Sequence, residues 1–150
     1  MAPTRKTAGG EVRIVDSRNF PVSKNVAAAL VTLKPGALRE LHWHPNASEW
    51  QFWLAGKGRM TIIMNEGKAR TMDFNANDVG FVPRVATHYI ENTGSTDAIF
   101  LEMFKADQFI DVSLNNWLRH VPPEAVTSHL NLGPELIAKI PAEKELIIAE

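Results

Sequence analysis

Short segments rich in Val, Ile, Phe and Trp recur along residues 11–105, and Pro, Gly, Asn and Asp interrupt them at regular intervals. Apolar segments with this punctuation favour antiparallel strands. The pattern predicts nine strands, at residues 11–17, 25–33, 38–44, 49–55, 59–65, 68–74, 78–83, 88–93 and 98–104. Because so many strands follow one another in this part of the chain, we expect a closed barrel or a sandwich.

The pattern changes after Asp107, where proline or a capping serine opens each of three segments, 113–121, 122–130 and 133–140. These openings predict two or three short helices. Their apolar faces must be covered by the outside of the barrel or by a partner subunit, and the sequence favours neither. The residues of these faces are Trp117, Leu118, Val121, Val126, Leu130, Leu136 and Ile140.

The chain has 150 residues, of which 45% are hydrophobic, and this is enough for one core and too little for two. We expect a flexible N-terminus at residues 1–10 and a barrel at residues 11–106. A helical extension at residues 107–150 is expected to pack on the barrel or on a partner subunit.

Charge and cysteine content exclude several classes of function. The 16 basic and 17 acidic residues form no basic run, so nucleic acid is not an expected partner. The absence of cysteine excludes disulfides, zinc thiolate sites and a thiol nucleophile. No stretch approaches the ~20 apolar residues of a membrane span, so no membrane partner is expected. The first ten residues lack the apolar run of a signal peptide, which predicts a cytoplasmic protein unless a leader has been removed.

A candidate metal site lies in the stretch HWHPNASE. His42 and His44 stand two residues apart on a predicted strand, so both side chains share one face while Trp43 points away. Glu49 opens the next strand after a short connection, and a hairpin-like geometry brings its carboxylate back beside the histidines. His88, on a later strand, is the candidate fourth ligand. Three imidazoles and a carboxylate suit Mn²⁺, Fe²⁺, Co²⁺, Ni²⁺ or Zn²⁺, and ligand type does not choose among these ions.

The residues around these ligands have the spacing of two cupin motifs. The first motif is matched by Gly36, His42, His44, Glu49 and Gly56, and the core of the second by Pro83, His88 and Asn92. The sequence therefore resembles the cupin superfamily. The resemblance implies an all-β fold, the double-stranded β-helix or jelly-roll barrel, here followed by short C-terminal α-helices.

The sequence departs from the second cupin motif at two positions. Asn77 and Val85 stand where the motif usually has glycine. Both are turn positions, so these departures concern the geometry of the loops rather than the metal ligands.

Three longer stretches are similar to the oxalate decarboxylase family, in particular to the second of its two cupin domains. They span residues 36–61, 78–94 and 100–118. The resemblance implies a manganese enzyme that uses O₂ as cofactor to convert oxalate to formate and CO₂. It places the metal on His42, His44, Glu49 and His88. Two alternatives stay open: an oxalate oxidase that forms CO₂ and H₂O₂, and a non-catalytic cupin that binds metal and small carboxylates.

The same resemblance implies catalytic roles for Arg39 and Glu102, as the active-site arginine and a candidate proton donor. A fixed guanidinium near the metal could hold a carboxylate of the substrate, although a surface charge at a strand end is the alternative. Glu102 shares a strand face with Phe100. If this face points into the barrel, burial should raise the pKa of Glu102; if it points outward, the carboxylate is solvated.

This chain differs from the described members of the family in the number of cupin domains and in the segment that forms the lid. The family's well-described members have two cupins, and decarboxylation is attributed chiefly to the first, which carries a mobile lid with a glutamate. Residues 109–118 stand in place of that lid, with Asp111 as the nearby acid. A site without a proton donor would act as an oxidase. The apolar helices and the likeness to paired cupins predict a homodimer or a higher homo-oligomer.

Overall fold

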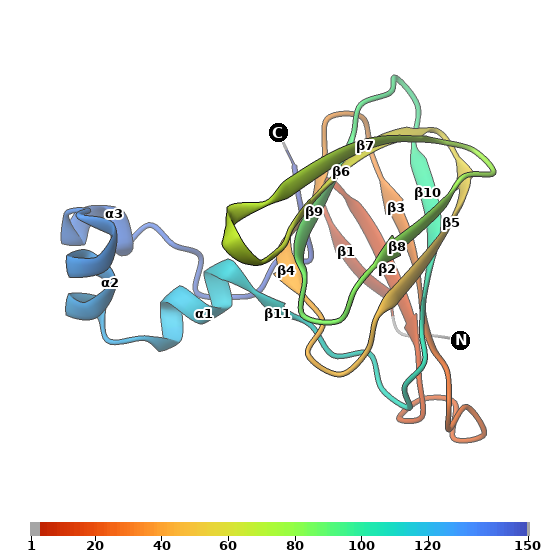
Figure 1. The fold of residues 1–150 in the computed structure, drawn as a ribbon, viewed down its shortest axis with the longest axis horizontal. Coiled ribbons are helices and arrows are strands. Elements are labelled where there is room, and N and C mark those ends of the chain that lie inside the picture. The colour runs from red at the N-terminus through yellow and green to blue at the C-terminus, as the bar shows by residue number, and fades with distance from the viewer. Residues whose placement is uncertain (1–3, 150) are drawn as a thin grey trace.

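Two antiparallel sheets face each other and form a barrel in the computed structural model, which describes residues 4–149 (Figure 1). The first sheet has the order β1 (Thr4–Thr7), β2 (Gly10–Val15), β3 (Ala27–Leu33), β10 (Ala98–Phe104), β5 (Glu49–Ala55) and β8 (Val79–Val82). The second has the order β11 (Val112–Ser113), β4 (Leu38–Trp43), β9 (Thr87–Asn92), β6 (Lys57–Ile63) and β7 (Ala69–Asn75), and β12 (Ile147–Ile148) also pairs with β4. The predicted all-β fold with short C-terminal helices is confirmed.

All nine predicted strands form, and their alternation divides inner from outer side chains. On β3 and β10 every second residue is buried. One end of the interior is apolar, where Trp53 stacks on Phe74 and Phe100 with ring centroids 5.1 and 4.7 Å apart. The other end holds the buried polar side chains Arg39, His42, His44, Glu49, Gln51, His88 and Glu102. A polar group so deeply buried needs a partner or a ligand, so this end is the candidate site.

The N-terminus differs from the expectation of a flexible segment. Residues 1–3 lie outside the described residues, but residues 4–7 form β1, which pairs with β2 from Thr4 opposite Arg13 to Thr7 opposite Gly10. The segment TRKT has no apolar residue, and the strand is mostly exposed. Its order comes from backbone pairing with β2, which leaves no signal in the hydrophobic pattern.

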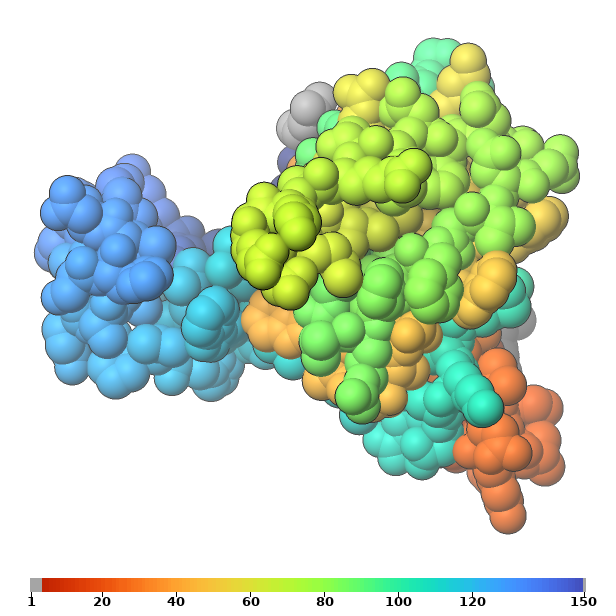
Figure 2. All heavy atoms as spheres, viewed as in Figure 1, coloured from red at the N-terminus to blue at the C-terminus, as the bar shows by residue number. Residues whose placement is uncertain are grey.

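The C-terminal extension contains three short helices, α1 (Leu114–His120), α2 (Pro123–Leu130) and α3 (Pro134–Ile137). Helices α2 and α3 lie side by side and project away from the barrel, as the ribbon and the space-filling view both show (Figures 1 and 2). Val126 and Ile137 are buried in this arm, whereas Trp117 and Leu136 are 56% and 43% exposed. Within the described chain, the barrel therefore does not cover the apolar faces of α2 and α3.

After the helices the chain returns to the barrel and adds the strand β12 to it, and the hydrophobic pattern does not predict this strand. Ile147 of β12 pairs with Arg39 of β4, and Glu40 donates its backbone N–H to the carbonyl of Leu146 at 3.2 Å. Leu146 and Ile147 are buried. This returning strand brings the last residues of the chain next to the polar end of the interior. None of the helices in residues 4–149 has the length and apolar content that a membrane crossing requires.

The two turns that depart from the cupin motif adopt the backbone conformation of glycine. Asn77 has φ 73° and Val85 has φ 62°, both in the left-handed region. Val85 donates its N–H to the carbonyl of His44 at 3.0 Å, so this turn lies against the metal-binding strand. Asparagine tolerates this conformation, whereas a β-branched residue does so only under strain.

Candidate metal centre

The four predicted ligands come together in one cluster. His42 lies on β4, His44 directly after it, Glu49 at the start of β5 and His88 on β9, and each is at most 2% exposed. One ligand atom from each of them lies within 4.8 Å of those of the others. His42 and His88 are direct partners across the β4–β9 pair. The strand position expected for His88 is confirmed, but β4 and β5 form no hairpin: they belong to different sheets, and Glu49 faces the histidines from the opposite sheet.

Backbone carbonyls fix the orientation of all three imidazole rings. Nδ1 of His42 lies 2.6 Å from the oxygen of Glu40, Nδ1 of His44 lies 2.8 Å from that of Ile110, and Nδ1 of His88 lies 3.1 Å from that of Ala86. A carbonyl oxygen only accepts, so each Nδ1 carries the hydrogen in the neutral ring. The lone pair then lies on Nε2, the atom that is free to bind a cation.

Glu49 offers a single oxygen to this cluster. Its Oε2 lies 2.9 Å from Nε2 of His44 and 3.1 Å from Nε2 of His88. Its Oε1 instead accepts a hydrogen bond of 2.5 Å from Nε2 of Gln51, whose own Oε1 accepts from Nε1 of Trp53 at 3.2 Å. Burial alone would raise the pKa of Glu49, but His88 and His44 lower it below its ordinary value. The carboxylate is therefore ionised, and Gln51 holds it in place.

These donor atoms fit a divalent metal ion. Nε2 of His42 and Nε2 of His44 are buried without a hydrogen-bond partner, although His44 approaches Glu49 closely. Burial, followed by the charge of Arg39, lowers the pKa of His42 well below its ordinary value, so this ring stays neutral. Three imidazoles and one carboxylate form a nitrogen and oxygen donor set without thiolate, which suits first-row divalent ions.

A β-bulge places Arg39 on the same side of the sheet as the ligands. Residues three apart on a regular strand point to opposite faces, so Arg39 and His42 should diverge. Between these two residues, β4 advances by three positions, whereas its partner β9 advances by two, from Ile90 to His88. The extra residue re-aims the strand, and Arg39 is fully buried inside the barrel. The alternative of a surface charge is excluded.

The guanidinium of Arg39 is largely occupied by protein partners. Its Nη2 donates to Oδ2 of Asp111 at 2.6 Å, and its Nη1 donates to the carbonyl of Leu146 at 3.1 Å and to Oε1 of Glu40 at 3.4 Å. Its Nε is buried and has no partner. The free donor marks a position for a further acceptor, such as the carboxylate of a ligand.

Glu102 lies in the interior of the barrel, so its strand face points inward and not into solvent. It is fully buried on β10, directly opposite Gln51 of β5, and both carboxyl oxygens lack a hydrogen-bond partner. Burial raises the pKa of Glu102 well above 4.5, the charge of Glu49 raises it further, and Arg39 partly opposes this. The carboxyl group therefore holds a proton to higher pH than a solvated glutamate does, which makes it a potential proton donor.

Aromatic rings border the ligands and keep water away from them. The ring of His44 lies 4.5 Å from that of Phe104 and 5.5 Å from that of Phe109, measured between centroids. Phe109 is held in place because its N–H donates to Oδ2 of Asp16 at 3.1 Å. A fixed charge such as that of Arg39 acts more strongly in such a dry site than in water.

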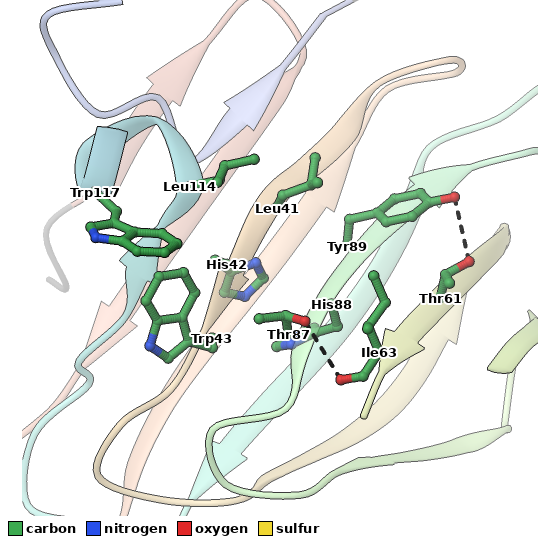
Figure 3. A pocket seen from close by; sticks show the side chains of 10 residues that line it. All are labelled: Leu41, His42, Trp43, Thr61, Ile63, Thr87, His88, Tyr89, Leu114 and Trp117. Carbon is green, nitrogen blue, oxygen red and sulfur yellow. Dashed lines mark hydrogen bonds between the residues drawn. The ribbon is translucent and has the colours of Figure 1, made fainter. Parts of the chain in front are cut away.

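A separate apolar groove of about 210 Å³ lies on the outer face of β4, β9 and β6, beside α1 (Figure 3). Trp43 points into this groove, away from the metal ligands as predicted, and meets Trp117 edge to face at 6.1 Å. His42 and His88 are among the residues that line the groove, whereas Arg39 and Glu102 are not. The groove therefore adjoins two of the metal ligands without containing the guanidinium or the buried carboxyl group.

Sequence reasoning missed Asp111 as a partner of Arg39, and it missed Lys144. The alternation of the predicted strand 49–55 places Gln51 on the face of Glu49, and the hydrogen bond between the two side chains confirms this. No local pattern could have found Lys144, whose Nζ reaches Oδ1 of Asp111 at 2.6 Å from the far end of the chain. His120 and His129 of the helical arm do not belong to the four-residue metal cluster.

Comparison with known sequences identifies relatives of this chain. The family model described as Cupin matches residues 2–138. The oxalate decarboxylase OxdC of Bacillus subtilis (strain 168) is 50% identical over 143 residues, which cover 95% of this chain and 37% of that protein. A probable oxalate decarboxylase of Arthroderma benhamiae is 48% identical over 142 residues, which cover 94% of this chain and 35% of that protein.

Solved structures agree with the sequence relatives. The structure of B. subtilis oxalate decarboxylase at pH 4.6 matches with a TM-score of 0.96 at 48% identity, and the match covers 99% of this chain and 39% of that one. A structure from work on the Mn(II) centres of the same enzyme matches with a TM-score of 0.95, also at 48% identity, over 98% of this chain and 39% of that one. The chain thus spans well under half the length of these relatives.

Proposed function

This chain belongs to the Cupin family, and we propose that it is a manganese-dependent enzyme of the oxalate decarboxylase type, which converts oxalate to formate and CO₂ with O₂ as cofactor. The names of its relatives support the substrate, and the Mn(II) centres of the Bacillus enzyme support the metal. Because the chain covers about a third of those proteins, their activity is proposed for this chain and not transferred to it by similarity.

One observation carries the proposal: the same buried interior holds the candidate metal ligands, a guanidinium and a carboxyl group whose pKa is raised. His42, His44, Glu49 and His88 would hold the ion. When bound, manganese would supply a Lewis-acidic centre and one-electron chemistry with dioxygen. The chain itself supplies Arg39 and Glu102, which are both fully buried. This combination fits a small acid that must be bound, oriented and protonated out of contact with water.

Arg39 binds and orients the substrate in this proposal. Its guanidinium lies inside the barrel, and its unpartnered Nε can donate to a carboxylate oxygen of oxalate. Charge-assisted bonds of this kind are strong where water is excluded. The carboxylate that is held by Arg39 is thereby fixed relative to the ligand cluster, and the bond to the departing CO₂ is oriented.

Glu102 is the proton donor in this proposal. Decarboxylation leaves a carbon that must receive a proton to become formate, and a buried carboxyl group with a raised pKa can deliver it. Asp111 cannot take this role: burial would raise its pKa, but Arg39 and Lys144 lower it to about 2, so Asp111 is ionised. Of Glu102 and Asp111, only Glu102 has a raised pKa.

Product analysis tests the proposal directly. Protein loaded with manganese should convert oxalate under air to formate and CO₂ in near-equal amounts, with little H₂O₂. Metal analysis of the same sample should give one manganese ion per chain. Failure to form either formate or peroxide from oxalate, with the metal site filled, would refute both enzymatic functions.

The oxidase alternative differs only in the proton donor. If Glu102 cannot reach the carbon, the substrate loses its electrons to O₂ and peroxide appears in near-stoichiometric yield. A substitution of Glu102 by Gln, which keeps the size and removes the proton, should therefore shift the products from formate toward H₂O₂. A non-catalytic cupin would bind oxalate and form no product in either protein.

Arg39→Lys separates carboxylate binding from metal binding. Lysine keeps the charge and loses the paired donors, so the affinity for oxalate should fall by at least about tenfold. Manganese content should stay that of the wild type, because Arg39 is not a ligand. Unchanged oxalate affinity would contradict both enzymatic readings of the site.

We also propose that the protein assembles as a homodimer or a higher homo-oligomer. The exposed apolar residues of the helical arm support this, since Trp117, Leu130 and Leu136 are 56%, 40% and 43% exposed. Exposed apolar residues that gather on one arm mark an interaction surface. Light scattering should give a mass of at least two chains, and a monomer at micromolar concentration would refute assembly.

A further inference from the structure

The carboxylate of Asp111 lies between two cations. Its Oδ2 accepts from Nη2 of Arg39 at 2.6 Å, and its Oδ1 accepts from Nζ of Lys144 at 2.6 Å. The side chains of these three residues are 9%, 0% and 17% exposed. The carboxylate of Asp111 thus binds the guanidinium of Arg39 as a carboxylate ligand would. In the proposed function, this guanidinium binds the substrate.

The position of Asp111 limits what Arg39 can offer to a ligand. Paired hydrogen bonds to a carboxylate use two neighbouring N–H groups of the guanidinium. Nη1 is engaged by the Leu146 carbonyl and by Glu40, so the remaining edge consists of Nε and Nη2. Nε is free, and Nη2 donates one of its two hydrogens to Asp111. A carboxylate that makes both bonds must therefore share Nη2 with Asp111, and the two negative charges repel each other there.

The backbone around Asp111 is held, so the competition concerns its side chain. The carbonyl of Ile110 accepts from His44 at 2.8 Å, and the N–H of Phe109 donates to Asp16 at 3.1 Å. Lys144 also donates to the backbone carbonyl of Asp111 at 3.0 Å. The carboxylate can leave Arg39 by rotation about its side-chain bonds while the loop keeps its place.

We propose that Asp111 is a specificity-determining residue: an internal competitor that lowers the affinity of Arg39 for every carboxylate, so that the site retains only acids that also bind the metal. This inference rests on the proposed function and deepens it. Lys144 is a positioning residue, because it holds Asp111 against Arg39.

The charge of Asp111 sets a threshold of affinity that a ligand must exceed. A monocarboxylate such as acetate or formate gains only its bonds to Arg39, and it binds against the negative charge of Asp111. A dicarboxylate meets the same repulsion, but its second carboxylate would also bind the metal and compensate for it. Asp111 therefore favours release of the monocarboxylate product while the dicarboxylate substrate stays bound.

Calorimetric titration of manganese-loaded protein with acetate and with oxalate, in the absence of O₂, tests the inference without turnover. Asp111→Asn keeps the shape of the side chain and removes its charge. If the competitor is lost, both acids should bind at least about tenfold more tightly, because the fraction of Arg39 available to a ligand increases. If Asp111 instead only orients Arg39 for the substrate, the same variant binds both acids more weakly or unchanged, and the inference is overturned.

Lys144→Gln provides a second variant that leaves Arg39 and Asp111 intact. This variant should also bind acetate more tightly than the wild type, but by a smaller factor than Asp111→Asn, because Asp111 is held less firmly against Arg39. Unchanged or weaker acetate binding in this folded variant would also count against the inference. Asp107→Asn, an exposed position of the same loop, is the matched control and should bind both acids as the wild type does.

The outcomes separate this inference from the proposed function. Wild-type protein that forms no product from oxalate would refute the enzyme, yet tighter acetate binding in Asp111→Asn would still establish the internal competitor. Conversely, an active enzyme whose Asp111→Asn variant binds acetate no better would refute the competitor alone.

Discussion

At the scale of single residues, the environment of a side chain decides its chemistry more than its type does. Glu49, Glu102 and Asp111 are three buried carboxyl groups with different protonation. The histidines lower the pKa of Glu49, Arg39 and Lys144 lower that of Asp111, and burial without a partner raises that of Glu102. The site can thus hold a metal-binding carboxylate, an ion-pairing carboxylate and a neutral acid next to one another.

The raised pKa of Glu102 predicts a loss of stability at high pH. A carboxyl group with a higher pKa in the folded than in the unfolded protein stabilises the fold below its unfolded pKa, and this contribution is lost as the pH rises through its folded pKa. In metal-free protein, the free energy of unfolding of the wild type relative to Glu102→Gln should therefore fall as the pH rises above about 4.5. Denaturant titrations at several pH values measure this difference, and a difference independent of pH would contradict it.

At the scale of the element, the inner face of β5 organises the metal ligand. Glu49, Gln51 and Trp53 follow one another at every second position and form a chain of hydrogen bonds. Gly80 of the neighbouring strand β8 makes room for it, since a Cβ there would lie 2.8 Å from Oε1 of Gln51. The element thus supplies both the ligand and the group that holds it.

Gln51 is therefore expected to influence the affinity for the metal. Gln51→Leu removes the hydrogen bond to Oε1 of Glu49, and manganese should bind about 10- to 100-fold more weakly, as is usual when the partner of a metal ligand is lost. Competition with a fluorescent chelator measures the affinity. Gln51→Glu, which repels Glu49 as well, should weaken binding at least as much, and wild-type affinity in both variants would disprove the role.

The turn before β9 predicts a stabilising substitution. Val85 has a positive φ, which costs a residue with a Cβ about 1–2 kcal/mol, and its side chain is 59% exposed, so it contributes little packing. Val85→Gly should stabilise the protein by about 0.5–1 kcal/mol after the greater entropy of glycine in the unfolded chain is subtracted. Asn77→Gly is the matched control and should change stability less, because asparagine tolerates this conformation. Equal effects in chemical denaturation would contradict the explanation.

At the scale of the whole molecule, the two sheets and the returning C-terminal strand meet around the site. His42 and His88 come from one sheet, Glu49 and Glu102 from the other, and β12 closes the open side of β4 beside Arg39. A metal ion bound between the sheets would bind the folded state alone, since the unfolded chain does not bring the ligands together. Metal binding and folding are then coupled.

Manganese should accordingly raise the stability of the folded protein. At a free concentration 100-fold above Kd, the gain is about 2.7 kcal/mol. Thermal unfolding with and without manganese measures it, with chelator-treated protein as the reference. In His42→Ala the shift should largely disappear, and a shift of the same size in this variant would show that the metal acts elsewhere.

The sequence by itself located the strands and the four candidate metal ligands. Strand periodicity places His42 and His44 on one face, and the spacing of the two cupin motifs adds Glu49 and His88, which come from other strands of the barrel. The two glycine positions of the motif that carry other residues were also identified in the sequence, although only the structure shows that Asn77 and Val85 keep the left-handed conformation.

The tertiary structure alone decided how Arg39 and Glu102 are placed and what surrounds them. A bulge that is visible only in the pairing of β4 with β9 turns Arg39 inward. The partners of Arg39 lie 72 and 107 residues away along the chain, at Asp111 and Leu146. Contacts over such separations arise from the packing of complete sheets and from the returning tail, and no local pattern of residues encodes them. For this reason the sequence located the candidate metal ligands, whereas only the structure shows that Asp111 binds Arg39 beside them.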